Sequence, residues 1–119
     1  MTKATEHKPY RDHEEALIES LRKDPAFATE YLNAVLEDGG EQELMMALRR
    51  VAEAFGGVPQ LAKATKLHVK TLYRTLSPQG NPELRSLTAM LKAMGMRIAV
   101  LPIPSPMKVT RRRRVQKVA

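Results

Sequence analysis

The chain has 119 residues, no cysteine and a formal net charge of +7. This length allows one small hydrophobic core with tails, and the lack of cysteine excludes a disulfide framework and a thiolate zinc site. No apolar run approaches the roughly 18 residues of a membrane-spanning helix, and the N-terminus has no apolar signal core. The three histidines are too scattered in the sequence to suggest metal ligands. We therefore expect a cytoplasmic protein without a cofactor.

Charge is divided unequally along the chain. Residues 1–57 carry 7 Lys and Arg against 12 Asp and Glu, whereas residues 58–101 carry 7 basic residues and a single acid, Glu83. Residues 102–119 add 6 basic residues and no acid. A basic half is typical of proteins that bind nucleic acid, whereas an acidic half repels DNA and suits a basic protein. The pattern predicts two partners, each bound by a different half.

The N-terminal part is expected to begin with a flexible segment, because residues 1–11 show no hydrophobic period. An apolar stripe then predicts a first helix that starts at Asp12 and ends near Lys23, with Glu15 placed to complete a capping box. Aspartate followed by proline, Asp24-Pro25, is a strong start signal for a second helix.

Two glycine pairs divide the helices that follow. Gly39-Gly40 ends the second helix, and Gly56-Gly57 supplies a left-handed cap for a third helix expected over 41–55. We assign residues 12–57 to one acidic, helical part that faces a protein partner and braces the segment behind it.

Residues 57–82 predict two short helices joined by a tight turn. Pro59–Thr65 is long enough for two helical turns, and Leu72 and Leu76 are the apolar anchors of a second helix over 68–76. If the leucines fix its angle, the outward side chains can reach base edges and phosphates in a major groove. A helical hairpin with a merely solvated cationic face is the alternative, and spacing alone does not decide between them.

Several motifs in this region carry a family resemblance. They are Leu61-Ala62, Leu67, Leu72-Tyr73-Arg74, Leu76-Ser77, Gly80-Asn81-Pro82 and the run from Leu91 through Ala93 to Gly95. They resemble the helix-turn-helix of the lambda-repressor (Xre) superfamily, and the chain is most similar to its branch of addiction-module antidotes, the HigA-like antitoxins. The resemblance extends less specifically over residues 16–101. Lys66 stands where the superfamily usually has glycine, which predicts a wider or strained turn.

The resemblance implies a role in DNA binding for eight residues of this region. Val69, Lys70 and Arg74 would lie nearest base edges; His68, Thr71 and Tyr73 would make flanking contacts; Gln60 and Lys63 would lie near phosphates. From the chemistry of base edges, Arg74 or Lys70 suits guanine and Val69 suits a thymine methyl group. His68 has a second possible role, as a cap of its helix.

A last helix and a strand are expected after the helix predicted over 68–76. Asn81-Pro82-Glu83 is a start signal, and the predicted buried stripe is Leu84, Leu87, Leu91 and Met94. Met96–Leu101 alternates and is rich in β-favoured residues, so we expect a strand that pairs with its copy in a homodimer and completes a part comprising residues 58–101.

The C-terminal residues 102–119 are expected to be a proline-rich linker and a disordered basic tail. The tail is either a solubilising segment or a flexible arm on DNA phosphates. Its cations are Lys108, Arg111, Arg112, Arg113, Arg114 and Lys117.

The predicted fold class is therefore all-α: a lambda-repressor-like helix-turn-helix domain of about five to six helices, followed by a short strand and a basic tail. No nucleophile with a base, paired carboxylates, metal cluster or phosphate-cradling loop occurs at a usable spacing, so we expect no enzyme.

Two functions remain. One is an antitoxin that binds a palindromic operator in double-stranded DNA and a small basic toxin, for which the resemblance implies a RelE/ParE-like (HigB-like) protein. The other is a stand-alone phage- or plasmid-type repressor without a toxin partner.

Overall fold

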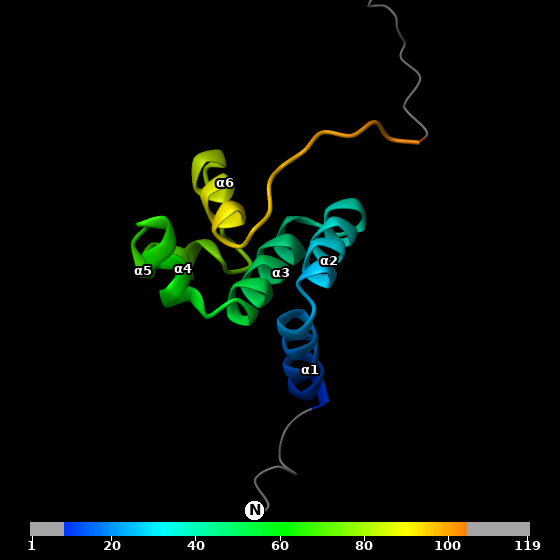
Figure 1. Cartoon of the computed structure of the whole chain (residues 1–119), viewed down its shortest axis with the longest axis horizontal. Helices are drawn as coiled ribbons and strands as arrows, with labels where there is room; N and C mark the ends of the chain where they lie inside the picture. The colour runs from blue at the N-terminus through cyan, green and yellow to red at the C-terminus, as the bar shows by residue number, and fades with distance from the viewer. Residues whose placement is uncertain (1–8, 105–119) are drawn as a thin grey trace, which may run out of the picture.

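Residues 9–104 of the chain are described by a computed structural model (Figure 1). This part of the chain is helical and contains no strand. None of its helices combines the length and hydropathy needed to cross a membrane. The helices are α1 (Pro9–Lys23), α2 (Pro25–Asp38), α3 (Glu41–Ala54), α4 (Val58–Thr65), α5 (Val69–Thr75) and α6 (Leu84–Ala93).

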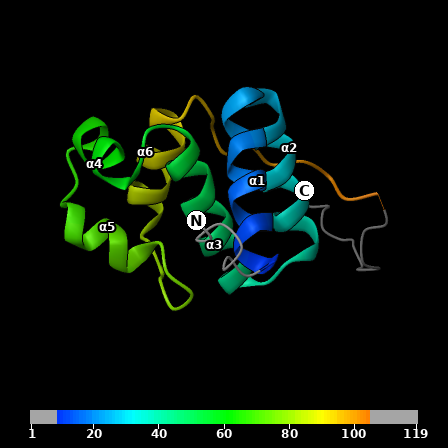
Figure 2. The ribbon, with the colours of Figure 1, turned by 90° about the horizontal axis from the view of Figure 1, so that it is seen from below.

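Helix α3 is the centre of the arrangement. It contacts α1 and α2 on one side and α4 on the other, and α4 in turn contacts α5 and α6. Figure 2 shows the same division, with α1 and α2 to one side of α3 and α4, α5 and α6 to the other. The buried side chains of α3 explain this position, because Met45, Ala47, Leu48, Val51 and Ala52 are 5% exposed or less and form one broad apolar face.

The start of α2 agrees with the sequence, but the starts of α1 and α6 do not. Asp24 is the N-cap of α2 in an extended conformation, and Pro25 follows it at the first helical position. Helix α1 begins at Pro9, so Asp12 lies inside its first turn rather than at its cap. Proline at a first helical position loses no backbone bond, which lets the helix begin earlier than the apolar stripe.

Helix α6 begins later than its proline signal predicts. Glu83 is its N-cap, and Pro82 lies outside the helix. Leu84, predicted to be buried, is 70% exposed, whereas Met90 and Met94 are 0% and 5% exposed. The expected position of Leu84 was wrong because the later start moves it to the first helical position, before the stripe of α6 meets α4.

Residues 96–104, which we call the arm, run away from the helices as an irregular segment (Figure 1). The strand predicted over 96–101 does not form in the single chain. A strand needs a partner for its backbone groups, and no segment of residues 9–104 pairs with it. The basic tail, from Lys108 to Lys117, and residues 1–8 lie outside the described residues.

Candidate nucleic-acid interface

Helix α4 forms the first half of the predicted helix-turn-helix. Gly57 precedes it with φ 96° and ψ 160°, a conformation that suits a residue without a side chain, and Pro59 lies in its first turn. Leu61 and Ala62 are buried, whereas Lys63 is exposed. One side of α4 therefore packs into the core, and the side that carries Lys63 is exposed to solvent.

The turn after α4 is left-handed at a residue other than glycine. Lys66 has φ 63° and ψ 26°, and no other non-glycine residue in the described part of the chain has a positive φ. The backbone N–H of Leu67 donates to the carbonyl oxygen of Ala62 at 3.2 Å, and Thr65 Oγ1 donates to the carbonyl oxygen of Leu61 at 2.8 Å. These bonds hold the turn, and the left-handed conformation at Lys66 costs about 1–2 kcal/mol. The strain expected from the missing glycine is confirmed.

Helix α5 has a capped start and a buried back. His68 is its N-cap, and His68 Nδ1 accepts a hydrogen bond from the backbone N–H of Lys70 at 3.3 Å. Leu72 and Leu76 are 1% and 0% exposed, which fixes the rotation of the helix about its own axis. The opposite face of α5 is therefore turned to solvent.

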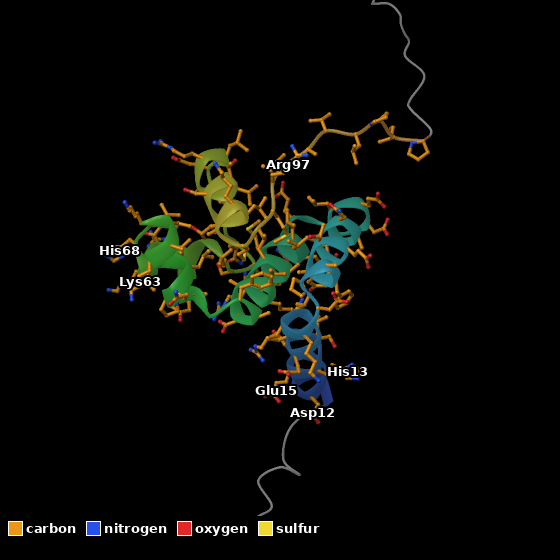
Figure 3. The ribbon with its side chains drawn as sticks, viewed as in Figure 1. Asp12, His13, Glu15, Lys63, His68 and Arg97 are labelled. Carbon is orange, nitrogen blue, oxygen red and sulfur yellow. The ribbon has the colours of Figure 1, made fainter. Side chains whose placement is uncertain are left out.

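The residues predicted to contact DNA lie on α4 and α5, which contact each other, and at the N-cap of α5. Figure 3 shows Lys63 and His68 on the same side of the molecule, at its α4–α5 edge. Val69 differs from the rest, because it is half-buried and packs against the core. We call the remaining, exposed residues the α4–α5 surface: Gln60, Lys63, His68, Lys70, Thr71, Tyr73 and Arg74.

Helix α3 adds a cation that the sequence did not indicate. The guanidinium carbon of Arg49 lies 5.0 Å from the centre of the Tyr73 ring, within the range of a cation–π interaction. Arg49 Nε also donates to Glu53 Oε2 at 3.1 Å. The spacing of Arg49 and Glu53 is that of a helical ion pair, but nothing in it relates Arg49 to a ring on α5. Arg49 therefore joins the central helix to the rim of the α4–α5 surface.

A second arginine of α3 joins the acidic helices to the core. Arg50 donates from a guanidinium nitrogen to the Tyr31 hydroxyl at 3.1 Å, and its Nε lies 3.3 Å from Glu14 Oε2. Burial lowers the pKa of Arg50, but its interactions with Tyr31 and Glu14 outweigh burial, so this pKa lies above the usual value for arginine. Arg50 stays charged and ties α1 and α2 to α3.

The acids of α1 lie far from the α4–α5 surface. Figure 3 shows Asp12 and Glu15 at the lower end of α1, away from Lys63 and His68 at the α4–α5 edge. Because α1 and α2 lie on one side of α3 and α4 and α5 on the other, the acidic helices and the α4–α5 surface are separated in space (Figure 2). Among the described residues, no group of three or more His, Asp or Glu side chains is arranged to hold a metal ion.

Comparison with known proteins adds the family. The model of a family described as "probable addiction module antidote protein" matches residues 12–102. The chain belongs to this family. No curated protein and no solved structure matches the chain.

The antidote family accounts for more than the helix-turn-helix region alone. Its match includes α2 to α6 and all but the first residues of α1, so the acidic helices and the α4–α5 surface both lie within the matched range. An antidote acts on a toxin, and family membership therefore implies a toxin partner. Of the two functions left open by the sequence, the antitoxin is the one supported.

Proposed function

We propose that the chain is the DNA-binding antitoxin of a type II toxin–antitoxin module and that it represses its own operon. In this proposal a homodimer places two copies of α5 in successive major grooves of a palindromic operator. The observation that carries the proposal is the division of α5: Leu72 and Leu76 are buried, while Lys70, Thr71 and Arg74 are exposed. A recognition helix needs one face fixed by packing and the other free to read bases.

The exposed cations of α5 are the candidates for specific contacts. Arg74 or Lys70 on the edge of a guanine would each contribute about 1–3 kcal/mol of discrimination against other bases. His68 is already engaged as the cap of α5 through Nδ1, which leaves Nε2 for a phosphate or a base. Gln60 and Lys63 on α4 are proposed phosphate contacts, in line with the usual role of the first helix.

The partner toxin is proposed to be a small basic protein of the RelE/ParE (HigB-like) kind. The exposed acids on α1 and α2 support this choice, because a basic partner is attracted to them and these helices lie on the other side of α3 from α5 (Figure 2). A toxin bound there would leave the α4–α5 surface free. The basic tail is proposed to add sequence-independent affinity through phosphate contacts.

The test is a gel-shift titration with the upstream region of the operon. Arg74→Ala and Lys70→Ala should each weaken operator binding by about 1–3 kcal/mol, because each removes a base contact without touching the core. The melting temperature should not change, since both side chains are exposed.

Lys23→Ala is the matched control. It removes one positive charge from an exposed position at the end of α1, on the other side of α3 from α5. It should bind the operator like the unmodified protein. Equal binding by all three variants would show that α5 does not read the operator.

A further inference from the structure

An apolar groove lies beside the root of the arm. It has a volume of about 490 Å³, and six leucines of α2, α3 and α6 line it. The polar residues in its lining are Thr29, Asn33 and Arg97, and the lining holds no Asp or Glu. The leucines are Leu32, Leu36, Leu44, Leu48, Leu87 and Leu91.

The arm presents apolar side chains to solvent next to this groove. Val100 is 93% exposed, Leu101 78% and Ile103 60%, and residues 98–104 carry no charge. Leu36, on the groove wall, is 60% exposed. Consecutive exposed aliphatic side chains beside an uncovered apolar groove are typical of an interaction surface rather than of a free monomer surface.

We infer that the groove binds the arm of a second copy of this chain, and that two copies exchange arms about a two-fold axis. This inference rests on the homodimer in the proposed function and specifies how that dimer forms. In a two-fold interface the same patch serves both copies, so one groove and one arm per chain suffice for two reciprocal contacts. The nine residues of the arm span at most about 32 Å when fully extended, enough to reach from one molecule into its neighbour.

The arm does not fill its own groove. Met96, Arg97, Ile98, Ala99 and Leu101 of the arm form one wall of the groove, whereas Val100, 93% exposed, does not line it. The space between that wall and the leucines is open to an arm that enters from elsewhere.

Charge favours a second copy over the basic toxin as the occupant. The groove lining has a single charged group, the cation Arg97, and a basic partner is better met by the acids of α1 and α2. The arm is uncharged from Ile98 onward and matches a neutral, leucine-lined groove. Pro102 and Pro104 lack the N–H groups of a β ladder, so side-chain burial must supply the affinity in that half of the arm.

The first test measures the dimer by sedimentation equilibrium over a dilution series. Leu36→Gln in the groove and Val100→Gln in the arm should each raise the dimer dissociation constant about tenfold or more, because each removes a large aliphatic side chain from the interface. Leu84→Gln is the matched control: Leu84 is 70% exposed on α6 but does not line the groove, and this variant should dimerise normally. All three variants keep the net charge and change exposed residues, so their helical circular dichroism should match the unmodified chain.

The second test uses the absence of cysteine from the chain. Leu36→Cys and a size-tagged Val100→Cys, mixed and oxidised mildly, should give a mixed disulfide dimer that neither variant gives alone. Links between two Val100→Cys chains alone would overturn the exchange in favour of arm-to-arm pairing. Dimerisation of Leu36→Gln and Val100→Gln at unmodified strength would also overturn it, and loss of toxin binding in those variants would then identify the toxin as the occupant.

A chain that stays monomeric at every concentration would overturn both the exchange and the homodimer. The gel shift of Arg74→Ala tests base recognition by α5 independently of the arm. Failure of the arm exchange can therefore be distinguished from failure of the proposed DNA binding.

Discussion

Lys66 is the residue at which the local chain conformation and the residue type disagree. Its φ of 63° suits glycine, and the two comparable helix ends in the chain, after α3 and after α6, use Gly56 with φ 114° and Gly95 with φ 84°. Lys66→Gly should therefore stabilise the protein by about 0.5–1 kcal/mol. Relief of about 1–2 kcal/mol of strain exceeds the roughly 0.5–1 kcal/mol of added chain entropy. Thermal melting and urea titration measure the gain.

Lys63→Gly is the control for this prediction. Lys63 is also exposed and cationic, but it lies inside α4, where glycine should cost about 1 kcal/mol. A lower melting temperature for Lys66→Gly would mean that the lysine side chain contributes more to the turn than its backbone strain removes.

Individual side chains also show how much of the α4–α5 surface could be predicted from the sequence. The buried positions of Leu72 and Leu76 and the exposure of Lys70 and Arg74 follow from helical periodicity, so that half of the site was predictable. The contact of Arg49 with Tyr73 was not predictable, because it depends on how α3 and α5 are placed relative to each other. Periodicity reports which face of a helix is apolar, but it carries no information about which polar side chains meet across two helices.

At the scale of elements, the existence of the helices was predictable and their ends were less so. The ranges 25–38 and 41–54 follow the sequence signals within a residue, whereas α1 starts three residues before Asp12 and α6 starts after Pro82. A proline marks a favourable start but does not compel one, so the packing of the adjacent turn decides. The strand over 96–101 has no partner within the chain, which no local propensity reveals.

The attachment of α1 and α2 to α3 depends on Arg50. Its side chain and that of Glu14 are 25% and 26% exposed, and Arg50 also holds the Tyr31 hydroxyl. Arg50→Met should lower the free energy of unfolding by about 1–3 kcal/mol, because it leaves a half-buried carboxylate and a hydroxyl without their shared cation. Urea unfolding followed by circular dichroism measures this loss.

Arg22→Met provides the comparison for Arg50→Met. Arg22 pairs with Glu19 at 2.5 Å, but the two side chains are 52% and 51% exposed. An exposed pair of this kind contributes about 0–1 kcal/mol. Equal losses in the two variants would show that Arg50 stabilises the fold no more than a surface ion pair does.

At the scale of the whole molecule, α3 separates the acid-rich helices α1 and α2 from the helices α4 and α5. Helices α1 and α2 lie on one side of α3 and the α4–α5 surface on the other, so the proposed toxin and operator would meet the protein at different places (Figure 2). This arrangement allows both to be bound at once, and it allows either surface to be changed without the other.

Reversal of charge on the acidic side tests the proposed toxin surface. Glu15→Lys combined with Glu30→Lys changes two exposed acids, on α1 and α2, and neither acid is a helix cap. The association rate with the proposed basic toxin should fall, most strongly at low salt, because opposite charges accelerate the encounter. Stability should change by no more than about 0.5 kcal/mol, as is usual for exposed residues. Operator binding should stay the same or improve slightly, since negative charge is removed far from α5.

The neutral pair Glu15→Gln with Glu30→Gln is the control. Its association rate with the toxin should fall by a smaller amount, and at high salt both double variants and the unmodified protein should associate at the same rate. An unchanged association rate of the doubly reversed protein at low salt would exclude the acidic side as the toxin-binding surface.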